Sequence, residues 1–342
     1  MAYLAATVLD AYRAQYASQQ MDVYEHRPSV YGALNAHIVD TPNLVNADEL
    51  EKAKMAQTHG VTIPVINKKT FTTTTTRSCT GLTNSNVSAY VTTSWATKAV
   101  GFHMIPSQYG NNYVKYQDDL NKKLLDMQIH LLAELDTLAY TNLSTYKSAV
   151  NNADGNPYTV AGDTMGVPFS DREQVFNELE SIMMANDLYG PYNIVGSPRV
   201  NSLVRHLANQ GAANAVNYAY EFMGYQFHYS NRVTVAAGDM ATVFAMPNGS
   251  IGFLTWVDPD SRMGLVAGPK EWSTIYLPLL GFEVGLLYQA TCGDNSTEAG
   301  AGAEASMIEN FNFSFDYSFL HAYNSNTAVY PGNIFKAGIS LT

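Results

Sequence analysis

Histidine is the side chain best suited to bind a metal ion or to move a proton near neutral pH. The eight histidines of this sequence lie no closer than about ten positions apart. Local metal motifs need two ligands within a few positions of each other. A site could still assemble from distant residues, but no spacing points to one. The sequence therefore predicts no metal site and no cofactor.

Three short segments could supply other chemistry. The carboxylates of 258–260 (Asp-Pro-Asp) could face a cation, but a proline turn is the better interpretation. Residues 300–302 (Gly-Ala-Gly) lack the Lys-Ser/Thr that completes a phosphate loop, and no serine lies in a nucleophile elbow. Arg77 could lower the pKa of Cys79, although an unreactive small residue is the simpler reading. We predict no catalytic residue and no enzymatic activity.

The charge balance limits the partners. The formal net charge is −11, and residues 281–335 contain no Lys or Arg. A dedicated nucleic-acid binder needs a basic face that neutralises phosphates. The sequence therefore argues against specific binding of nucleic acid.

The two cysteines, Cys79 and Cys292, are too few for a disulfide framework, so reduced thiols in a cytosolic setting are expected. The apolar start at residues 2–9 has no basic region before it, which argues against a signal peptide. No apolar run approaches the length that crosses a membrane.

Charged residues make up 14% of the chain, against a typical value of about 25%. Much of the surface must therefore consist of uncharged polar side chains and of the 23 tyrosines. Tyrosine suits subunit interfaces, because it combines flat apolar area with a hydroxyl group. It is also favoured in β structure, and the sequence leaves both interpretations open.

The strongest pattern is a Thr-rich extended segment, 71–97, followed by a long amphipathic helix, 113–147. The extended segment has high β propensity but too few large apolar residues to form a core, so it must lie on another surface. We expect a hairpin that turns within 80–86 and contacts neighbouring subunits. The predicted interface residues are Thr72, Thr74, Thr76, Arg77, Tyr90, Thr92 and Trp95.

The helix predicted at 113–147 would span roughly 50 Å, which is long for a compact enzyme domain. Its apolar residues recur at helical spacing and predict one buried stripe. The stripe consists of Leu120, Leu124, Met127, Leu131, Leu135 and Leu138.

The remaining segments predict a mixture of helices and strands. Before residue 46 we expect a short helical start, with Leu4, Val8, Leu9 and Tyr12, and then an irregular stretch through Pro28 and Pro42. A helix at 47–57 and a strand at 61–66 should follow. Beyond the long helix we expect a capping box at 170–173 that opens a helix, a strand at 192–195, a helix from 198, a strand pair at 225–235, a hairpin at 242–256 that turns at Asn248-Gly249, strand structure at 272–287, a loop at 291–305, and a strand at 308–319. The last strand has one aromatic face, which could stack bases. Its acidic surroundings favour a core strand packed on the long helix instead.

Two local stretches sharpen the overall order of elements. Residues 192–198 (Tyr-Asn-Ile-Val-Gly-Ser-Pro) lead into a helix with Leu203 and Leu207, and residues 224–233 form a strand that ends in a Ser/Asn-rich turn. With the hairpin and the long helix, this order resembles the major capsid proteins of tailed bacteriophages and related viruses, the Johnson fold. The resemblance implies an α+β fold with an N-terminal arm, an extended β-hairpin loop, a long spine helix in a peripheral domain and an α/β axial domain. The implied ranges are 1–46 for the arm, 61–105 for the extension loop, 169–274 for the axial domain, and 47–60, 106–168 and 275–342 for the peripheral domain.

The resemblance also implies a function. The chain would self-assemble, through hexamers and pentamers, into an icosahedral shell that encloses packaged viral DNA without binding it specifically. Assembly would take place in the host cytoplasm, and scaffolding, portal and decoration proteins are conceivable partners. An encapsulin-like nanocompartment shell is one alternative, and a soluble hydrolase or lyase with a site built from dispersed residues is another.

Overall fold

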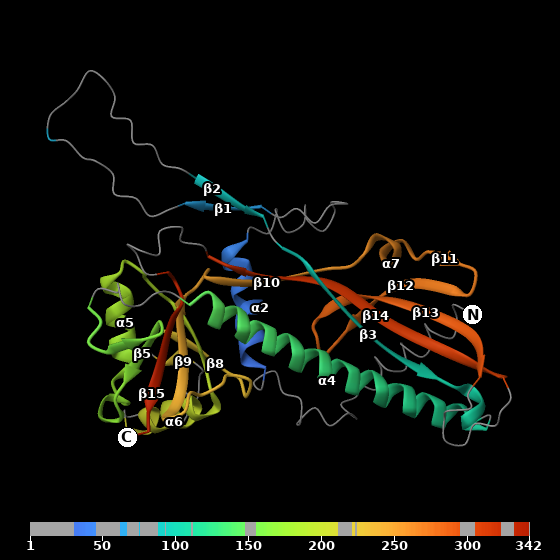
Figure 1. The fold of residues 1–342 in the computed structure, drawn as a ribbon, viewed down its shortest axis with the longest axis horizontal. Helices are drawn as coiled ribbons and strands as arrows, with labels where there is room; N and C mark the ends of the chain where they lie inside the picture. Colours follow the sequence, from blue (N-terminus) through green and yellow to red (C-terminus); the bar gives the residue numbers. More distant parts are fainter. Residues whose placement is uncertain are drawn as a thin grey trace. The chain divides into compact units, whose positions relative to one another are not determined.

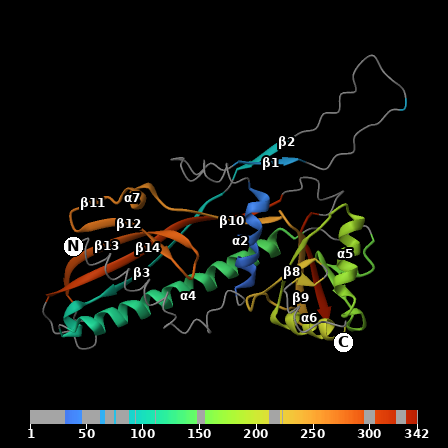
Figure 2. The same ribbon diagram turned by 180° about the vertical axis from the view of Figure 1, so that it is seen from behind.

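A computed structural model of the chain describes residues 31–45, 62–66, 75, 88–92, 94–110, 112–147, 155–210, 221–222, 224–294, 305–322 and 332–341. The chain forms two compact units (Figures 1 and 2). Unit 1 comprises residues 1–27, 95–135 and 254–318, and unit 2 comprises residues 28–94, 136–253 and 319–342. The predicted domain ranges are not tested by this division and stay a prediction.

Unit 1 is built on the antiparallel strands of a sheet with the order β10-β14-β13-β12-β11, in which β3 also pairs with β14. The strands are β3 (Ala96–Met104), β10 (Ile251–Trp256), β11 (Val266–Ala267), β12 (Lys270–Leu277), β13 (Phe282–Asp294) and β14 (Ala305–His321). The predicted aromatic strand is confirmed as β14, where Phe311, Phe313 and Phe315 are buried on one face. Phe102 of β3 stacks on Phe311 at a ring distance of 5.4 Å.

The long helix is also confirmed, as α4 (Tyr113–Thr145). Its stripe is buried from Leu120 to Leu135, whereas Leu138 is half-buried and Ala139 is buried beside it. In unit 1 the helix is tied to the sheet side by Gln128, whose side-chain oxygen accepts a hydrogen bond from the Leu279 amide at 3.2 Å.

Within unit 1, tyrosine hydroxyls donate hydrogen bonds to carboxylate groups. Tyr116 of α4 and Tyr288 of β13 both donate to the buried carboxylate of Glu309, the latter at 3.1 Å. Tyr109 donates to Asp119 at 2.6 Å. Burial, and then the bond to Glu309, hold the pKa of Tyr116 well above its ordinary value, so this phenol remains a donor.

Unit 2 is built on a seven-stranded sheet with the order β4-β5-β15-β9-β6-β8-β7. Its strands are β4 (Thr159–Ala161), β5 (Thr164–Val167), β6 (Tyr192–Gly196), β7 (Glu221–Phe222), β8 (Tyr225–Tyr229), β9 (Asp239–Pro247) and β15 (Phe335–Ser340). The strand predicted at 192–195 is confirmed as β6, which is buried along its whole length and runs parallel to β8. With two sheets and several helices, the predicted α+β class is confirmed.

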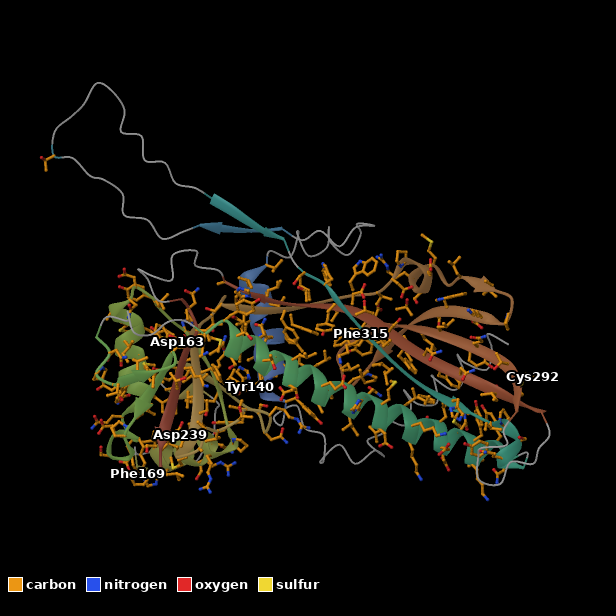
Figure 3. The ribbon with its side chains drawn as sticks, in the orientation of Figure 1. Tyr140, Asp163, Phe169, Asp239, Cys292 and Phe315 are labelled. Carbon is orange, nitrogen blue, oxygen red and sulfur yellow. The ribbon has the colours of Figure 1, made fainter. Side chains whose placement is uncertain are left out.

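Helices cover both faces of the unit 2 sheet. The apolar sides of α5 (Val175–Ala185) and α6 (Pro198–Gln210) share one hydrophobic core with Ile194, Val243 and Phe335. Because side chains alternate along a strand, Phe244 points to the opposite face. There its ring meets that of Tyr140, from the last turns of α4, at 5.9 Å (Figure 3).

Helix α2 (Gly32–Leu44) lies within the range predicted to be irregular, so that prediction is wrong. The buried side of this helix carries His37, Asp40 and Thr41, whereas Ile38 and Val39 are exposed. The sequence therefore shows no amphipathic spacing that could have indicated the helix. Its N-terminus donates the Leu34 amide to the buried carboxylate of Asp136 at 2.9 Å, and Ser230 donates its hydroxyl to the same carboxylate. Gly32 passes so close to the Tyr229 backbone that a Cβ atom would not fit.

Asp40 of α2 makes a second anchor. Its buried carboxylate accepts hydrogen bonds from the backbone amides of Gly249 at 2.7 Å, Ser250 at 2.9 Å and Ile251 at 3.1 Å. The predicted turn at Asn248-Gly249 is present, but the predicted hairpin is wrong because β9 and β10 belong to different sheets. The turn amides bond to Asp40 instead of closing a hairpin.

Three further expectations have clear outcomes. The strand pair at 225–235 is wrong: only β8 forms, and it pairs with β6 and β7. The helix after residue 170 is confirmed as α5, but its capping box is wrong, since the helix begins at Val175 and Ser170 donates to Asp171 instead. The helix predicted at 47–57 lies outside the described residues.

The Asp40 anchor leads to a stability prediction. Replacing Asp40 with Ala leaves the buried amides of Ser250 and Ile251 and the part-buried amide of Gly249 without their acceptor, and each unsatisfied buried group costs about 1–3 kcal/mol. We expect Asp40→Ala to lower the free energy of unfolding by at least about 3 kcal/mol in chemical denaturation. The control is Asp118→Ala on the exposed side of α4, and equal stability of the two variants would contradict the prediction.

The buried histidines of unit 2 give a pH prediction. Burial lowers the pKa of both His37 and His228 to about 4, from an ordinary value of 6.5. Below about pH 6.5 the unfolded chain therefore takes up protons that the folded chain does not, so stability falls until about pH 4. Each histidine contributes a loss on the order of 3 kcal/mol across this window.

Burial raises the pKa of Asp136, which acts in the opposite sense, because the folded chain then binds a proton more readily than the unfolded one. The measurement is the slope of unfolding free energy against pH for the parent and for His37→Gln. We expect a smaller slope in the variant, and an unchanged slope would contradict the assignment.

Candidate subunit interface

The predicted extension loop is represented by a two-stranded sheet of its own. Strand β1 (Thr62–Ile66) pairs antiparallel with β2 (Ser88–Thr92), so that Pro64 lies opposite Tyr90. Among the described strands these two pair only with each other (Figure 1). The base of the predicted hairpin therefore forms as expected, without joining either large sheet.

The predicted interface residues fall into three groups. Tyr90 and Thr92 lie on β2, opposite Pro64 and Thr62 of β1. Trp95 lies just before β3 and is half-buried. Thr72, Thr74, Thr76 and Arg77 lie outside the described residues, so their role in an interface stays a prediction.

The two strands of the hairpin differ in the number of backbone N–H groups that they can donate to another strand. Proline has no N–H group, so Pro64 leaves β1 one donor short, whereas β2 contains no proline. An unpaired strand edge is a ready template for a strand from another chain. Strand β2 is therefore the better edge for a contact with a neighbour.

The return strand of the loop is held firmly where it enters unit 1. Strand β3 pairs with β14 from Ala96 opposite Tyr317 to Met104 opposite Glu309. Lys98 of β3 makes an ion pair with Glu134 at 2.6 Å, and Thr97 donates to Asp316 at 2.6 Å. These contacts anchor the 96–104 end of the loop to unit 1 and do not involve the side chains of β1 and β2.

A second candidate surface was missed by the sequence reading. Residues 258–260 begin a short helix, α7 (Pro259–Met263), which Asp258 caps by accepting a hydrogen bond from the Ser261 amide at 2.9 Å. Met263, the last residue of this helix, is 71% exposed, and Val266 of β11 is 70% exposed. We call Met263, Leu265 and Val266 the α7–β11 tip. Its apolar residues were not recognised, because their exposure has no signal in the sequence.

The tip is well ordered by its backbone. The Trp272 amide donates to the Leu265 carbonyl at 2.8 Å, and β11 pairs with β12 through Val266 opposite Glu271. Apolar side chains held outward on a fixed backbone are typical of a protein interface. The tip can therefore contact a neighbour at little entropic cost.

The described residues include few side chains placed so that they could bind a metal ion or react. No three of their His, Cys, Asp and Glu side chains are grouped so that they could hold a metal ion. Asp258 and Asp260 do not act together on a cation, because Asp258 serves as a helix cap. Cys292 is an exposed free thiol, and Cys79 lies outside the described residues. No helix in the described part of the chain is both long and apolar enough to span a membrane.

Comparison with known proteins gives structural likenesses only. No family model matches the sequence, and no curated protein matches it. The chain is similar to a solved structure from Mycobacterium phage Che8, at 11% identity and a TM-score of 0.49, covering 86% of this chain and 89% of that one. It is also similar to chains of two capsid structures. That of cyanophage P-SCSP1u has 11% identity, coverage of 83% and 84%, and a TM-score of 0.46. That of cyanophage A-1(L) has 12% identity, coverage of 81% and 86%, and a TM-score of 0.47.

The α7–β11 tip leads to an assembly prediction. A charge at Met263 or Val266 should change the free energy of unfolding by no more than about 0.5 kcal/mol, because both side chains are exposed. A buried contact with a neighbour would be lost, so we expect Met263→Asp and Val266→Asp to form fewer large particles in sedimentation. Val114→Asp is the control, since Val114 is 64% exposed on α4. Normal particle yield from both tip variants would show that the tip is not an interface.

Proposed function

We propose that this chain is a structural subunit that assembles in many copies into a closed protein shell, the capsid of a bacteriophage. One observation carries the proposal. A two-stranded hairpin that belongs to neither large sheet is followed at once by β3 and by the 33-residue helix α4. An α/β unit with the β6-α6-β8 crossover then follows, and the chain returns to the long antiparallel strands β12, β13 and β14. This is the order expected of a capsid subunit.

The physical argument concerns the hairpin. A two-stranded hairpin is marginally stable by itself in water. Its Thr-rich composition offers little apolar area, at about 25 cal/mol per Å² buried, to hold it on its own subunit. A neighbouring subunit can provide the missing partner through backbone contacts at the β2 edge. The hairpin is therefore better explained as an assembly element than as part of a core.

The proposal extends to a structural rather than enzymatic role, and to the partners expected from the resemblance. Hexamers and pentamers of this chain would enclose packaged DNA, with assembly in the host cytoplasm. The low charge and the tyrosine content support a surface devoted to protein contacts. Contents distinguish the viral shell from a nanocompartment: nuclease-protected DNA supports the first, and a protein cargo supports the second.

The test removes the hairpin in two steps. One variant replaces residues 67–87 with a short Gly-Ser linker and keeps β1 and β2, and a second replaces residues 62–92. Because β1 and β2 pair only with each other among the described strands, both variants should fold with near-parental circular dichroism and melting temperature. Neither should form shells visible by electron microscopy.

The parent, with a scaffolding protein supplied if it needs one, is the reference for shell formation. Shells of normal size and yield from the 62–92 variant would refute the assembly role of the hairpin. Global unfolding of that variant would mean that the segment belongs to the core.

A further inference from the structure

Helix α2 is attached to unit 2 largely through polar groups. Among its buried side chains only Leu34 is a large aliphatic one, and His37, Asp40 and Thr41 are buried beside it. The Thr41 hydroxyl accepts a hydrogen bond from the Phe253 amide at 2.8 Å, in addition to the bonds made by Asp40 and at the helix N-terminus. The attachment of α2 therefore depends on hydrogen bonds and on groups whose charge can change with pH.

His37 lies at the centre of this attachment. Its side chain is fully buried, and its Nδ1 donates a hydrogen bond to the Ala33 carbonyl at 2.8 Å. Its ring meets the edge of the Phe319 ring at a centroid distance of 5.1 Å. Because Nδ1 already carries a proton, a second proton must go to Nε2, which is buried. Protonation of His37 therefore places a full charge inside unit 2.

Two more histidines of unit 2 lie near α2. The Asn35 side chain of α2 donates to Nδ1 of His228, on β8, at 3.4 Å. A proton added to that nitrogen puts a donor where Asn35 needs an acceptor, so the bond is lost. His321, at the end of β14, stacks on Tyr146 at 3.6 Å and lies within electrostatic reach of His37.

The charges around these rings compensate only part of an added positive charge. Asp40 lies within electrostatic reach of both His37 and His228, but its oxygens already accept bonds from three backbone amides and from Asn43. His37 also lies within reach of the other two rings. Protons on more than one ring would therefore repel each other.

The protonation of these rings differs between the folded and the released state. Burial lowers the pKa of His37 and His228 to about 4, and it also lowers the pKa of His321. A ring released to water takes up a proton below about pH 6.5. Falling pH therefore favours a state in which α2 has left its site.

The carboxylate at the N-terminus of α2 acts against this release. Burial raises the pKa of Asp136, which is faced by Arg232 and Tyr31. The folded state then binds a proton on Asp136 more readily than the released state does. One carboxyl group thus opposes three histidines.

The main core of unit 2 lies on the other face of its sheet. Side chains alternate along β8, so that Phe227 points into the core shared with α5 and α6 while His228 points toward α2. Proton uptake around α2 therefore leaves that core unchanged. In the sequence, α2 is the described element that precedes the hairpin strands β1 and β2, whereas β3 anchors the other end of the loop to unit 1.

We propose that α2 is an acid-sensitive latch: proton uptake by His37, His228 and His321 releases the helix from unit 2 while the rest of the unit stays folded. The release is a property of a single subunit and goes beyond the proposed function. Its consequence for a shell, a hairpin that acid loosens at the end nearer α2, rests on the proposed function.

The experiment measures amide hydrogen exchange of the full-length chain between pH 7.5 and 4.5, corrected for the effect of pH on the exchange chemistry itself. Residues 32–44 of α2 are compared with residues 175–185 of α5. Each released histidine raises the opening constant of α2 by up to about tenfold for each pH unit below 6.5. We expect this rise in α2 and a much smaller one in α5.

Three variants identify the groups that take up the protons. His37→Gln and His228→Gln should each reduce the rise in α2 opening by about tenfold per pH unit, and His321→Gln should reduce it as well. The control is His130→Gln on the exposed side of α4 in unit 1, which should leave the rise unchanged. The comparison of α2 with α5 in the parent needs no variant, so the test does not depend on how well each variant folds.

A parental pH dependence in all three variants would overturn the proposal. An equal rise in α5 would also overturn it, because acid would then unfold unit 2 as a whole. Either result leaves the proposed function intact, since exchange is read from the subunit alone. A parent that releases α2 in acid but never forms shells would overturn the proposed function and leave the latch standing.

Discussion

The carboxylate of Asp40 determines how the chain passes between its two sheets. Three consecutive amides after β9 would normally close a hairpin, and the Asn248-Gly249 turn is suited to one. Here those amides donate to Asp40, at the point where the chain leaves β9 of the seven-stranded sheet and enters β10 of the other sheet. Asp136 fixes the opposite end of α2. Two buried carboxylates, Asp40 of α2 and Asp136 of α4, thus hold the two ends of α2 in unit 2.

Much of the fold could be predicted where the sequence is periodic. Helix α4 and strand β14 have long apolar patterns, and both form as expected. Helix α2 could not be found this way, because polar His37 and Asp40 are buried while apolar Ile38 and Val39 are exposed, and Pro42 argues against a helix. The failed hairpin at residues 242–256 has a similar cause: the partner of its turn is an aspartate about 210 positions away.

Part of the candidate interface could also be predicted from a pattern in the sequence. A Thr-rich segment without a core is visible in the sequence, and its paired base forms at β1 and β2. The α7–β11 tip was not predictable, because an exposed methionine and a buried one look alike in a sequence.

The tyrosine-to-carboxylate bonds of unit 1 affect how the subunit responds to salt. Tyr116 and Tyr288 satisfy the buried carboxylate of Glu309 with neutral donors in place of cations. Dissolved salt weakens attraction between exposed full charges far more than it weakens a buried bond from a neutral hydroxyl. Raised ionic strength should therefore leave the bonds from Tyr116 and Tyr288 to Glu309 largely unchanged, so that α4, β13 and β14 stay joined in unit 1 when exposed ion pairs are screened.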